Sequence, residues 1–403
     1  MRGVLGDTPG MDGKLSEETL RRLVERYALP ESIHVTRPAM PRLEDYAKSL
    51  ESIWASRWLT NAGDFHQDFE RRLAEYLGVE HISLFCNGTI ALLVALHALR
   101  INSGEVITTP FTFPATVHVL YWNGIRPVFC DIDENTYNLD PARIEELISP
   151  DTKAILPVHV YGTPCDVDGI AAVAERHGLQ VIYDAAHAFG LRCHDRPVLE
   201  YGDVSMLSFH ATKLFSTIEG GALVSRSAAQ KKRIDFLKNF GIADEETVIG
   251  PGINGKMNEF QAAFGLLELD LVDQEIAGRR AVAEAYRRGL ADIPGLRCLE
   301  DAPHVERTYP HFPVRVDAAA FGMSRDDLHR ALRQFNVVAR KYFHPLCSHY
   351  SCYASLPSAN PDHLPAAERV AAEILCLPIY GDLAPQHAET IARIVAELHA
   401  AAT

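Results

Sequence analysis

Short apolar runs alternate with longer segments of helical periodicity from about residue 66 onward, and few folds accommodate such a pattern. Strands buried on both faces are short apolar runs in a sequence, and parallel strands need a crossover helix between them. The alternation therefore predicts an α/β domain in which helices cover a parallel sheet. The strand-like runs are HISLFC, EVITT, PVFCDI, AILPVHV, QVIYD, SMLSF and GALVS, and the helical segments include TIALLVALHAL, TFPATVHVLYWNG, ARIEELI, VDGIAAVAERHG and KKRIDFLKNFG.

The C-terminal part of the chain has a different order of helical and strand-like segments. A long helical stretch runs from about Glu259 to Leu290. After it we expect a smaller α+β domain, which contains a strand in YPHFPVRV, a helix in SRDDLHRALRQF capped by Ser324, a short strand in VVARKYF and a closing helix in PQHAETIARIVAELHAA.

The N-terminal part contains one amphipathic stretch, LSEETLRRLVERYAL, in which Ser16 is a capping residue and Pro30 ends the helix. We expect a surface helix that packs on the body of the protein or on a partner subunit. At 403 residues the chain is too long for one ordinary core. We therefore predict an N-terminal extension (1–40), a large domain (41–270) and a small C-terminal domain (271–403).

The composition excludes several classes of protein. A net charge of −14 argues against attraction to nucleic acid or to an anionic membrane, because neutralising phosphates requires a basic surface. The first residues contain no apolar export signal, and no apolar run is long enough to span a membrane. The cysteines are scattered, and the closest two, Cys347 and Cys352, match no common zinc spacing. We expect a cytoplasmic protein with reduced cysteines and no metal site.

The segment SLFCNGTIALLVALHAL contains a strand that ends at Cys86, a turn through Asn87 and Gly88, and a helix that begins at Thr89. The start of a helix offers free N–H groups and the positive end of a dipole, both of which bind phosphate. Thr89 adds a hydroxyl donor, and Gly88 lets a ligand approach the backbone. Many α/β proteins have the same pattern without a ligand, so the segment alone leaves both interpretations open.

A second segment, QVIYDAAHAFG, places Asp184 at the carboxyl end of an apolar strand, and His187 follows after two alanines. Ligands of open α/β sheets bind at that end of the strands. A carboxylate there can pair with a protonated pyridine nitrogen and keep the ring an electron sink. The small alanines suit a flat ring close to the backbone. The alternative is an aspartate that caps the next helix.

A third segment, SMLSFHATKLFSTIEGGALVS, contains a polar turn between two apolar strands, and this turn holds Ser208, His210 and Lys213. A lysine in a cleft loses water, which lowers its pKa, and the neutral amine can then attack an aldehyde. Ser208 would supply another donor to a phosphate. The alternative is a solvated loop lysine, which is the commoner fate of this residue.

Taken together, these segments resemble the DegT/StrS family of sugar aminotransferases, which are fold type I enzymes that use pyridoxal 5'-phosphate (PLP). The resemblance implies an aspartate aminotransferase-like α/β fold, with a mostly parallel seven-stranded sheet between helices and a smaller α+β C-terminal domain. It covers nearly all of the chain after about residue 35. The motifs that carry it are WLTNAGDFHQDFE, NGTIAL, TTPFTFPAT, PVFCDID, PVHVYGTPCDVDGI, DAAHAFG, SFHATK, EGGALV, GINGKMNEFQAAFGL and ILCLPIY.

The resemblance also implies roles for single residues. Lys213 would carry the cofactor as a Schiff base and move the proton, and Asp184 would pair with the pyridine nitrogen. Phe113, from TTPFTFPAT, would stack on the cofactor ring, and His187 would lie near its phenolic oxygen.

The cofactor's phosphate would be held by Gly88, Thr89 and Ser208 in the same comparison. Asn254, from GINGKMNE, matches a residue that the family lends to the phosphate site of the neighbouring subunit. This match implies a homodimer with shared active sites.

The resemblance is strongest to the subgroup that acts at C4 of dTDP-4-keto-6-deoxyglucose, because of GKMNE and the segment ARKYFHPLCSHYSCYASLPSA, although many members carry Arg where this chain has Lys256. A dehydrating branch of the family has His in place of the lysine, so Lys213 favours transamination. We expect an amino acid, L-glutamate, to donate nitrogen to a nucleotide-linked keto sugar. Residues that could contact the sugar nucleotide, or could equally be packing or loop residues, are Trp58, Thr60, Asn61, Lys256 and His344.

Two rival functions stay open at this point. One is an aminotransferase of the same family that acts at C3 of a sugar, on another nucleotide sugar or on a cyclitol ketone. The other is a non-catalytic scaffold or regulator that keeps the fold. The presence of both Lys213 and Asp184 speaks against a scaffold, because a pure binding module has no chemical need for the pair.

Overall fold

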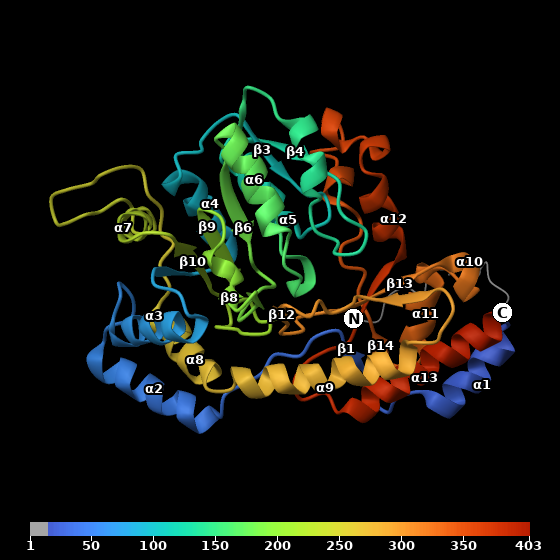
Figure 1. Cartoon of the computed structure of the whole chain (residues 1–403). Helices are drawn as coiled ribbons and strands as arrows, with labels where there is room; N and C mark the ends of the chain where they lie inside the picture. Colours follow the sequence, from blue (N-terminus) through green and yellow to red (C-terminus); the bar gives the residue numbers. More distant parts are fainter. Residues whose placement is uncertain (1–14) are drawn as a thin grey trace.

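A seven-stranded sheet forms the centre of the molecule (Figure 1). The computed structural model describes residues 15–403 of the chain. Each predicted strand-like run contains one strand, and all the strands are parallel except β10 (Gly221–Ser225), which is antiparallel to both neighbours. The prediction of an α/β fold with a mostly parallel sheet is confirmed. Across the sheet, the strands are β2 (Ile82–Phe85), β10, β9 (Val204–Ser208), β6 (Gln180–Asp184), β5 (Thr152–Leu156), β3 (Glu105–Thr108) and β4 (Arg126–Phe129).

Helices cover both faces of this sheet. Successive side chains of a strand point to opposite faces, and accordingly Ile182 packs among residues of α4 and α5 while Tyr183 packs among residues of α6. Asp184 is next in this alternation, so it points toward α4 and α5. One face carries α4 (Gly88–Ala98), α5 (Pro114–Trp122) and α7 (Ala228–Leu237), and the other carries α3 (Asp64–Leu77), α6 (Val167–His177) and α8 (Glu259–Leu269).

One predicted helix is wrong. The run ARIEELI forms two short 3₁₀ turns, Pro141–Arg143 and Glu145–Leu147, instead of an α-helix. Pro150 follows closely and disfavours helical backbone before it. The segment is therefore too short to overcome the cost of helix nucleation.

The long helical stretch after Glu259 is divided in the structure. It forms α8 and a second helix, α9 (Val272–Leu290), with a break at Asp270 and Leu271. Residues of α8 and of the first turns of α9 pack in the core beside the central sheet, whereas α9 residues from Val282 onward belong to the C-terminal core. The break lets one stretch of chain serve both cores.

The C-terminal part of the chain forms a three-stranded antiparallel sheet with its own core. The strand predicted in YPHFPVRV, the helix capped by Ser324 and the closing helix are all present. The strand predicted in VVARKYF is only β14 (Val337–Val338), which pairs with β1 (Ile33–His34). The main elements are β11 (Leu296–Cys298), β13 (Phe312–Val316), α11 (Arg325–Gln334), β15 (Ile374–Leu377) and α13 (Pro385–Ala402).

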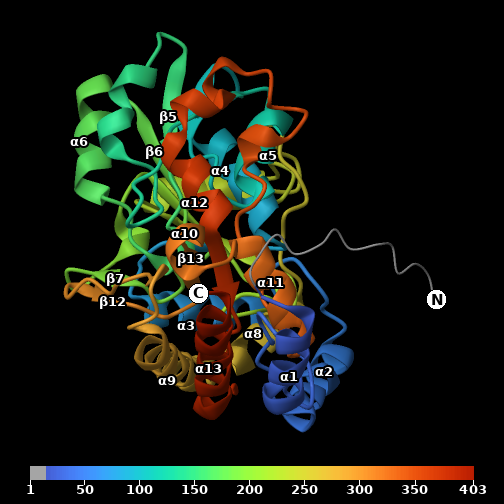
Figure 2. The same cartoon turned by 90° about the vertical axis from the view of Figure 1, so that its right-hand side faces the viewer.

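The predicted N-terminal helix is α1 (Glu17–Tyr27), and it lies against α13 (Figures 1 and 2). The side-chain oxygen of Ser16 accepts a hydrogen bond from the N–H of Thr19, as its capping role predicts. Residues 1–14 of the predicted extension lie outside the described residues. None of the helices in the described part of the chain combines the length and the apolar composition that a membrane span requires.

A segment after β14 returns to the central sheet. It includes α12 (Pro365–Glu373), which the sequence did not reveal, and its Tyr353 and Val370 share a core with Val117 and Phe129 of the large sheet region. The chain therefore crosses between the two sheets more than once. The predicted domain boundaries at residues 40 and 270 stay predictions.

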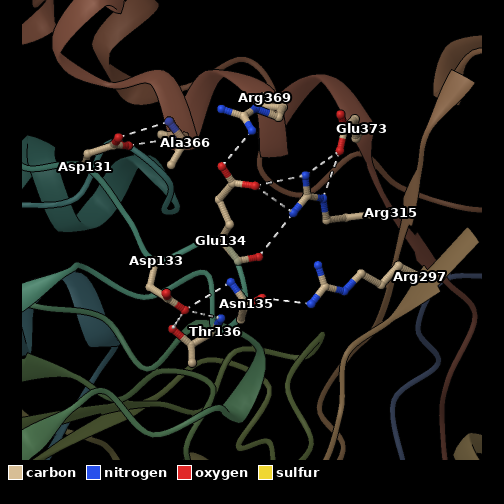
Figure 3. Close-up of polar contacts among 11 residues, drawn as sticks. Asp131, Asp133, Glu134, Asn135, Thr136, Arg297, Arg315, Ala366, Arg369 and Glu373 are labelled. Atoms are coloured by element: carbon tan, nitrogen blue, oxygen red, sulfur yellow. Dashed lines mark hydrogen bonds and ion pairs between the residues drawn. The ribbon is translucent and has the colours of Figure 1, made fainter. Parts of the chain in front are cut away.

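Polar contacts hold α12 and β13 against the loop that follows β4 (Figure 3). Both carboxylate oxygens of Asp131 accept backbone N–H groups at the start of α12, from Ala366 and Ala367, at 3.0 and 2.8 Å. A carboxylate in this position satisfies free N–H groups of the first helical turn and complements the helix dipole.

Arg315 of β13 is the centre of the ion pairs in the same region (Figure 3). Its guanidinium donates two hydrogen bonds to one carboxylate oxygen of Glu373, at 2.6 and 2.9 Å, and one to the carbonyl of Glu134 at 3.2 Å. The Arg315 side chain is only 9% exposed, whereas Arg369, which pairs with Glu134 from α12, is 55% exposed.

We expect Arg315→Met to lower the free energy of unfolding by about 2–4 kcal/mol, because it leaves a poorly solvated carboxylate and a carbonyl without their donor. The matched change Arg369→Met should cost less than about 1 kcal/mol, because its pair is solvated. Urea denaturation followed by circular dichroism measures both. Equal losses in the two variants would contradict this account.

Candidate active site

A cavity of about 280 Å³ lies at the carboxyl ends of the central strands. Its walls come from the start of α4, the residues before α5, the turn after β6, and the end of β9 with the loop that follows. Segments that are far apart in the sequence thus meet at the edge of the sheet where α/β proteins bind ligands. Seven of the eight predicted cofactor residues line the cavity: Gly88, Thr89, Phe113, Asp184, His187, Ser208 and Lys213.

Asp184 is buried, with 4% of its surface exposed. One carboxylate oxygen accepts a hydrogen bond from the Thr116 hydroxyl at 2.7 Å, and the other accepts the N–H of Ala186 at 3.0 Å. Burial raises the pKa of Asp184, while these two bonds and the charge of Lys213 oppose the rise. Residues 185–191 form turns rather than a helix, so the alternative of a helix cap is wrong.

Lys213 faces the same cavity from a loop between β9 and β10. Burial lowers the pKa of Lys213 to about 8, and the nearby carboxylate of Asp184 opposes the shift. The lysine is half-buried and lines a cavity with an acid, which does not match the alternative of a fully solvated loop lysine. Near physiological pH the neutral amine, which is the reactive form, is therefore a larger fraction than in an ordinary solvated lysine.

Backbone hydrogen bonds hold the lysine loop as a continuation of the β9–β10 hairpin. The N–H of Phe209 donates to the carbonyl of Gly220 at 2.8 Å, and the N–H of Ala211 donates to the carbonyl of Ile218 at 2.9 Å. Within the loop, the N–H of Lys213 donates to the carbonyl of His210 at 2.8 Å. Lys213 is thus presented from a fixed turn.

The helix at the proposed phosphate site begins one residue earlier than predicted. Asn87 is the capping residue, because its side-chain oxygen accepts the N–H of Ile90 at 2.9 Å, and Gly88 and Thr89 are the first two helical residues. The first N–H groups of a helix have no partner within it. A side chain on Gly88 would place its Cβ 3.0 Å from the sulfur of Met206, so any larger residue would crowd this side chain.

His187 packs beside a second histidine, His311, that the sequence did not indicate. The two rings lie 4.5 Å apart, and Nδ1 of His187 accepts the N–H of Tyr161 at 3.3 Å. Burial lowers the pKa of His187 well below its usual value and lowers the pKa of His311 to about 3. Both imidazoles are therefore neutral, and both line the cavity.

Sequence reasoning missed several cavity residues for identifiable reasons. His311 lies in YPHFPVRV, a segment read only as a strand. Thr116 does not itself line the cavity but holds Asp184 from α5, and no signal in the sequence indicated this contact. Phe343, whose ring is parallel to that of His187 with centroids 5.9 Å apart, had no signal in the sequence.

The remaining candidates lie outside the cavity among the described residues. Lys256 donates to the side chain of Asn239 at 2.6 Å and lies over the ring of Phe240, and Asn254 is exposed close by. The other four are exposed: Trp58, Thr60 and Asn61 lie between α2 (Leu43–Ser56) and α3, and His344 follows β14. One chain therefore does not bring these six predicted residues to the cofactor cavity.

Comparison with known proteins gives one consistent result. The model of the DegT/DnrJ/EryC1/StrS aminotransferase family matches residues 42–396. A dTDP-4-amino-4,6-dideoxy-D-glucose transaminase of Escherichia coli is 49% identical over 353 residues, which are 87% of this chain and 95% of that enzyme. An enzyme of the same name from Shigella dysenteriae is 46% identical over 91% of this chain and 99% of its own length.

A solved structure, DesI in the presence of its TDP-sugar product, superposes with a TM-score of 0.87 at 36% identity and covers 92% of this chain and 93% of its own. Because the family match spans most of the chain and the relatives align over nearly their full length, the resemblance inferred from the motifs is confirmed. The chain belongs to the DegT/DnrJ/EryC1/StrS aminotransferase family and is an enzyme, an aminotransferase.

Proposed function

We propose that this enzyme uses PLP to transfer an amino group from an amino acid, L-glutamate, to C4 of dTDP-4-keto-6-deoxyglucose. One observation carries the proposal: Lys213 and Asp184 line one cavity together with the start of α4. The choice of sugar rests on relatives of 46–49% identity that are named for the corresponding 4-amino sugar nucleotide.

The residues around the cavity fit PLP on three counts. The cofactor presents an aldehyde, a pyridine nitrogen and a phosphate, and the cavity offers an amine, a buried carboxylate and a helix start. Because Gly88 has no side chain, the helix start lies close to the side chains of Met206 and Ser208. Thr89 and Ser208 add hydroxyl donors beside it. Bound PLP would supply an electron sink for the carbanion that transamination requires.

The protein's own groups have separable tasks in this proposal. Asp184 is held by Thr116 and Ala186 with its charge buried, so it favours a cation beside it and would keep the pyridine nitrogen protonated. Lys213, with a pKa of about 8, can accept a proton and return it near neutral pH. The neutral His187 can donate one hydrogen bond to an oxygen without adding charge.

We also propose a homodimer with shared active sites. The loop between α7 and α8 extends away from the body of the chain (Figure 1) and carries Asn254 and Lys256. Apolar side chains on and near this loop are exposed, including Phe240, Val248 and Ile249. Apolar groups gathered in this way are typical of a surface that another protein covers. In a dimer, the loop would bring Asn254 to the phosphate site of the partner subunit.

Replacing Lys213 tests the core of the proposal. With PLP, L-glutamate and dTDP-4-keto-6-deoxyglucose, mass spectrometry and NMR should show a 4-amino sugar nucleotide as the product. Lys213→Gln should reduce turnover by at least about 100-fold, because no other group in the cavity replaces the proton transfer. The matched change Lys232→Gln, at an exposed lysine, should leave turnover unchanged. Full turnover in Lys213→Gln would refute the assignment, and nitrogen at C3 would refute the choice of substrate.

Removing the Thr116 hydroxyl tests how Asp184 is held. Because this hydrogen bond stabilises the charged carboxylate, Thr116→Val should raise the pKa of Asp184. The acid limb of the pH profile of kcat/KM should therefore move to higher pH, and the relative loss should be greatest at low pH. We expect a decrease of about 10-fold or more, since a hydrogen bond to a charged group contributes roughly 1.5–3 kcal/mol.

Thr116→Ser keeps the hydroxyl and should restore the profile. A profile that Thr116→Val does not shift would show that this hydroxyl has only a packing role.

Mixing two inactive variants tests the shared site. Asn254→Ala should raise the PLP concentration required for half-maximal activity. Chains of Asn254→Ala and Lys213→Gln are refolded together at limiting PLP. In a mixed dimer, one site combines the Lys213 of the first variant with the Asn254 of the second and is therefore intact. Random pairing makes half of the dimers mixed, so about a quarter of all sites should be active. No recovery, with mixed dimers verified by mass spectrometry, would contradict donation across the interface.

A further inference from the structure

A small sheet on the outside of the molecule brings together three side chains that are good metal ligands. Strands β7 (Arg192–Cys193) and β8 (Arg196–Pro197) form a hairpin, and β12 (Val305–Glu306) pairs with β7 on its other side. The hairpin turn consists of His194 and Asp195, both with positive φ (50° and 59°). Such a turn matches the twist of the two strands that it joins.

The three ligands are Cys193, His194 and His304. Their ligand atoms, one sulfur and two ring nitrogens, all lie within 4.8 Å of one another. The two imidazole rings stack with centroids 4.3 Å apart and planes inclined by 10°. The backbone is fixed as well, because the N–H of His194 donates to the carbonyl of His304 at 2.9 Å.

The chemistry of these donors selects a particular class of metal. One thiolate and two imidazoles are the ligands that Zn²⁺ prefers, and three protein ligands with a water molecule complete its tetrahedron. The donor atoms of such a site lie about 3.3–3.8 Å apart, given Zn–N and Zn–S bonds of about 2.0–2.3 Å. The observed spacing requires shifts of about 1 Å or less, which the two exposed histidines can make.

We propose that Cys193, His194 and His304 bind one Zn²⁺ ion at the surface of each chain. Cys193 is buried and is not in a disulfide, while the histidines are exposed, so the fourth position of the metal faces solvent. None of the three ligands lines the active-site cavity. The metal joins the β7–β8 hairpin to the strand that precedes His311, so its effect is on stability rather than on transamination. The sequence predicted no metal site, because His304 is far from the other two ligands along the chain.

Zinc content measures the proposal directly. Holoenzyme stripped with a chelator is dialysed against buffered Zn²⁺, and bound metal is measured by mass spectrometry. Wild type should retain about one zinc ion per chain, whereas His304→Ala and Cys193→Ser should retain none at this site. The controls His363→Ala and Cys352→Ser, at exposed positions elsewhere, should retain it. His304 is exposed, so its replacement does not disturb a core. Equal zinc content in wild type and in the two ligand variants would overturn the proposal.

X-ray absorption at the zinc edge identifies the ligands independently of transaminase activity. Wild type and Cys352→Ser should show one sulfur and nitrogen neighbours of imidazole type, and any zinc that Cys193→Ser takes up from excess Zn²⁺ should show no sulfur neighbour. Zinc surrounded only by nitrogen and oxygen in the wild type would overturn the assignment of Cys193. Zn²⁺ should also raise the thermal midpoint of wild type but not that of His304→Ala, and an equal rise in both would count against the site.

Discussion

Two neighbouring parallel strands, β6 and β9, end at the same edge of the sheet, and the organisation of the active site depends on this constraint. Asp184 at the end of β6 is in register with Met206 of β9, and β9 continues for two residues to Ser208 before it enters the lysine loop. Hydrogen bonding between the strands therefore fixes the position of Asp184 relative to the start of the lysine loop. The helix start at Gly88 is fixed to the same place by its packing against Met206.

Burial then gives these groups their chemical character. Burial makes charge costly on Asp184 and, to a lesser extent, on the half-buried Lys213, and each group partly offsets that cost for the other. Thr116 stabilises the carboxylate further. His187 and His311 have no acid beside them to offset burial, so they stay neutral. One cavity thus holds a carboxylate, an amine with a lowered pKa and uncharged imidazoles, and the local environment sets the charge of each.

The sequence predicted the central sheet well because its strands are buried on both faces and their apolar character is continuous. It placed Gly88, Asp184 and Lys213 correctly at the cavity, since each follows a strand that ends there, although their roles stay predictions. It could not locate His311, because a histidine within a strand has no local signal. Asn254 and Lys256 lie away from the cavity of their own chain, and no pattern within one chain specifies a contact with another. Residues 142–148 have the composition of an α-helix but form 3₁₀ turns, because a nearby proline disfavours helical backbone.

The lysine loop has a consequence for how substrates enter. Its two sides are hydrogen-bonded to each other and continue directly into β9 and β10, which lie within the sheet. Opening this loop would require breaking hydrogen bonds that extend the β9–β10 pairing. The backbone of Lys213 is therefore held in place, so the exchange of donor and acceptor substrates does not depend on movement of this loop.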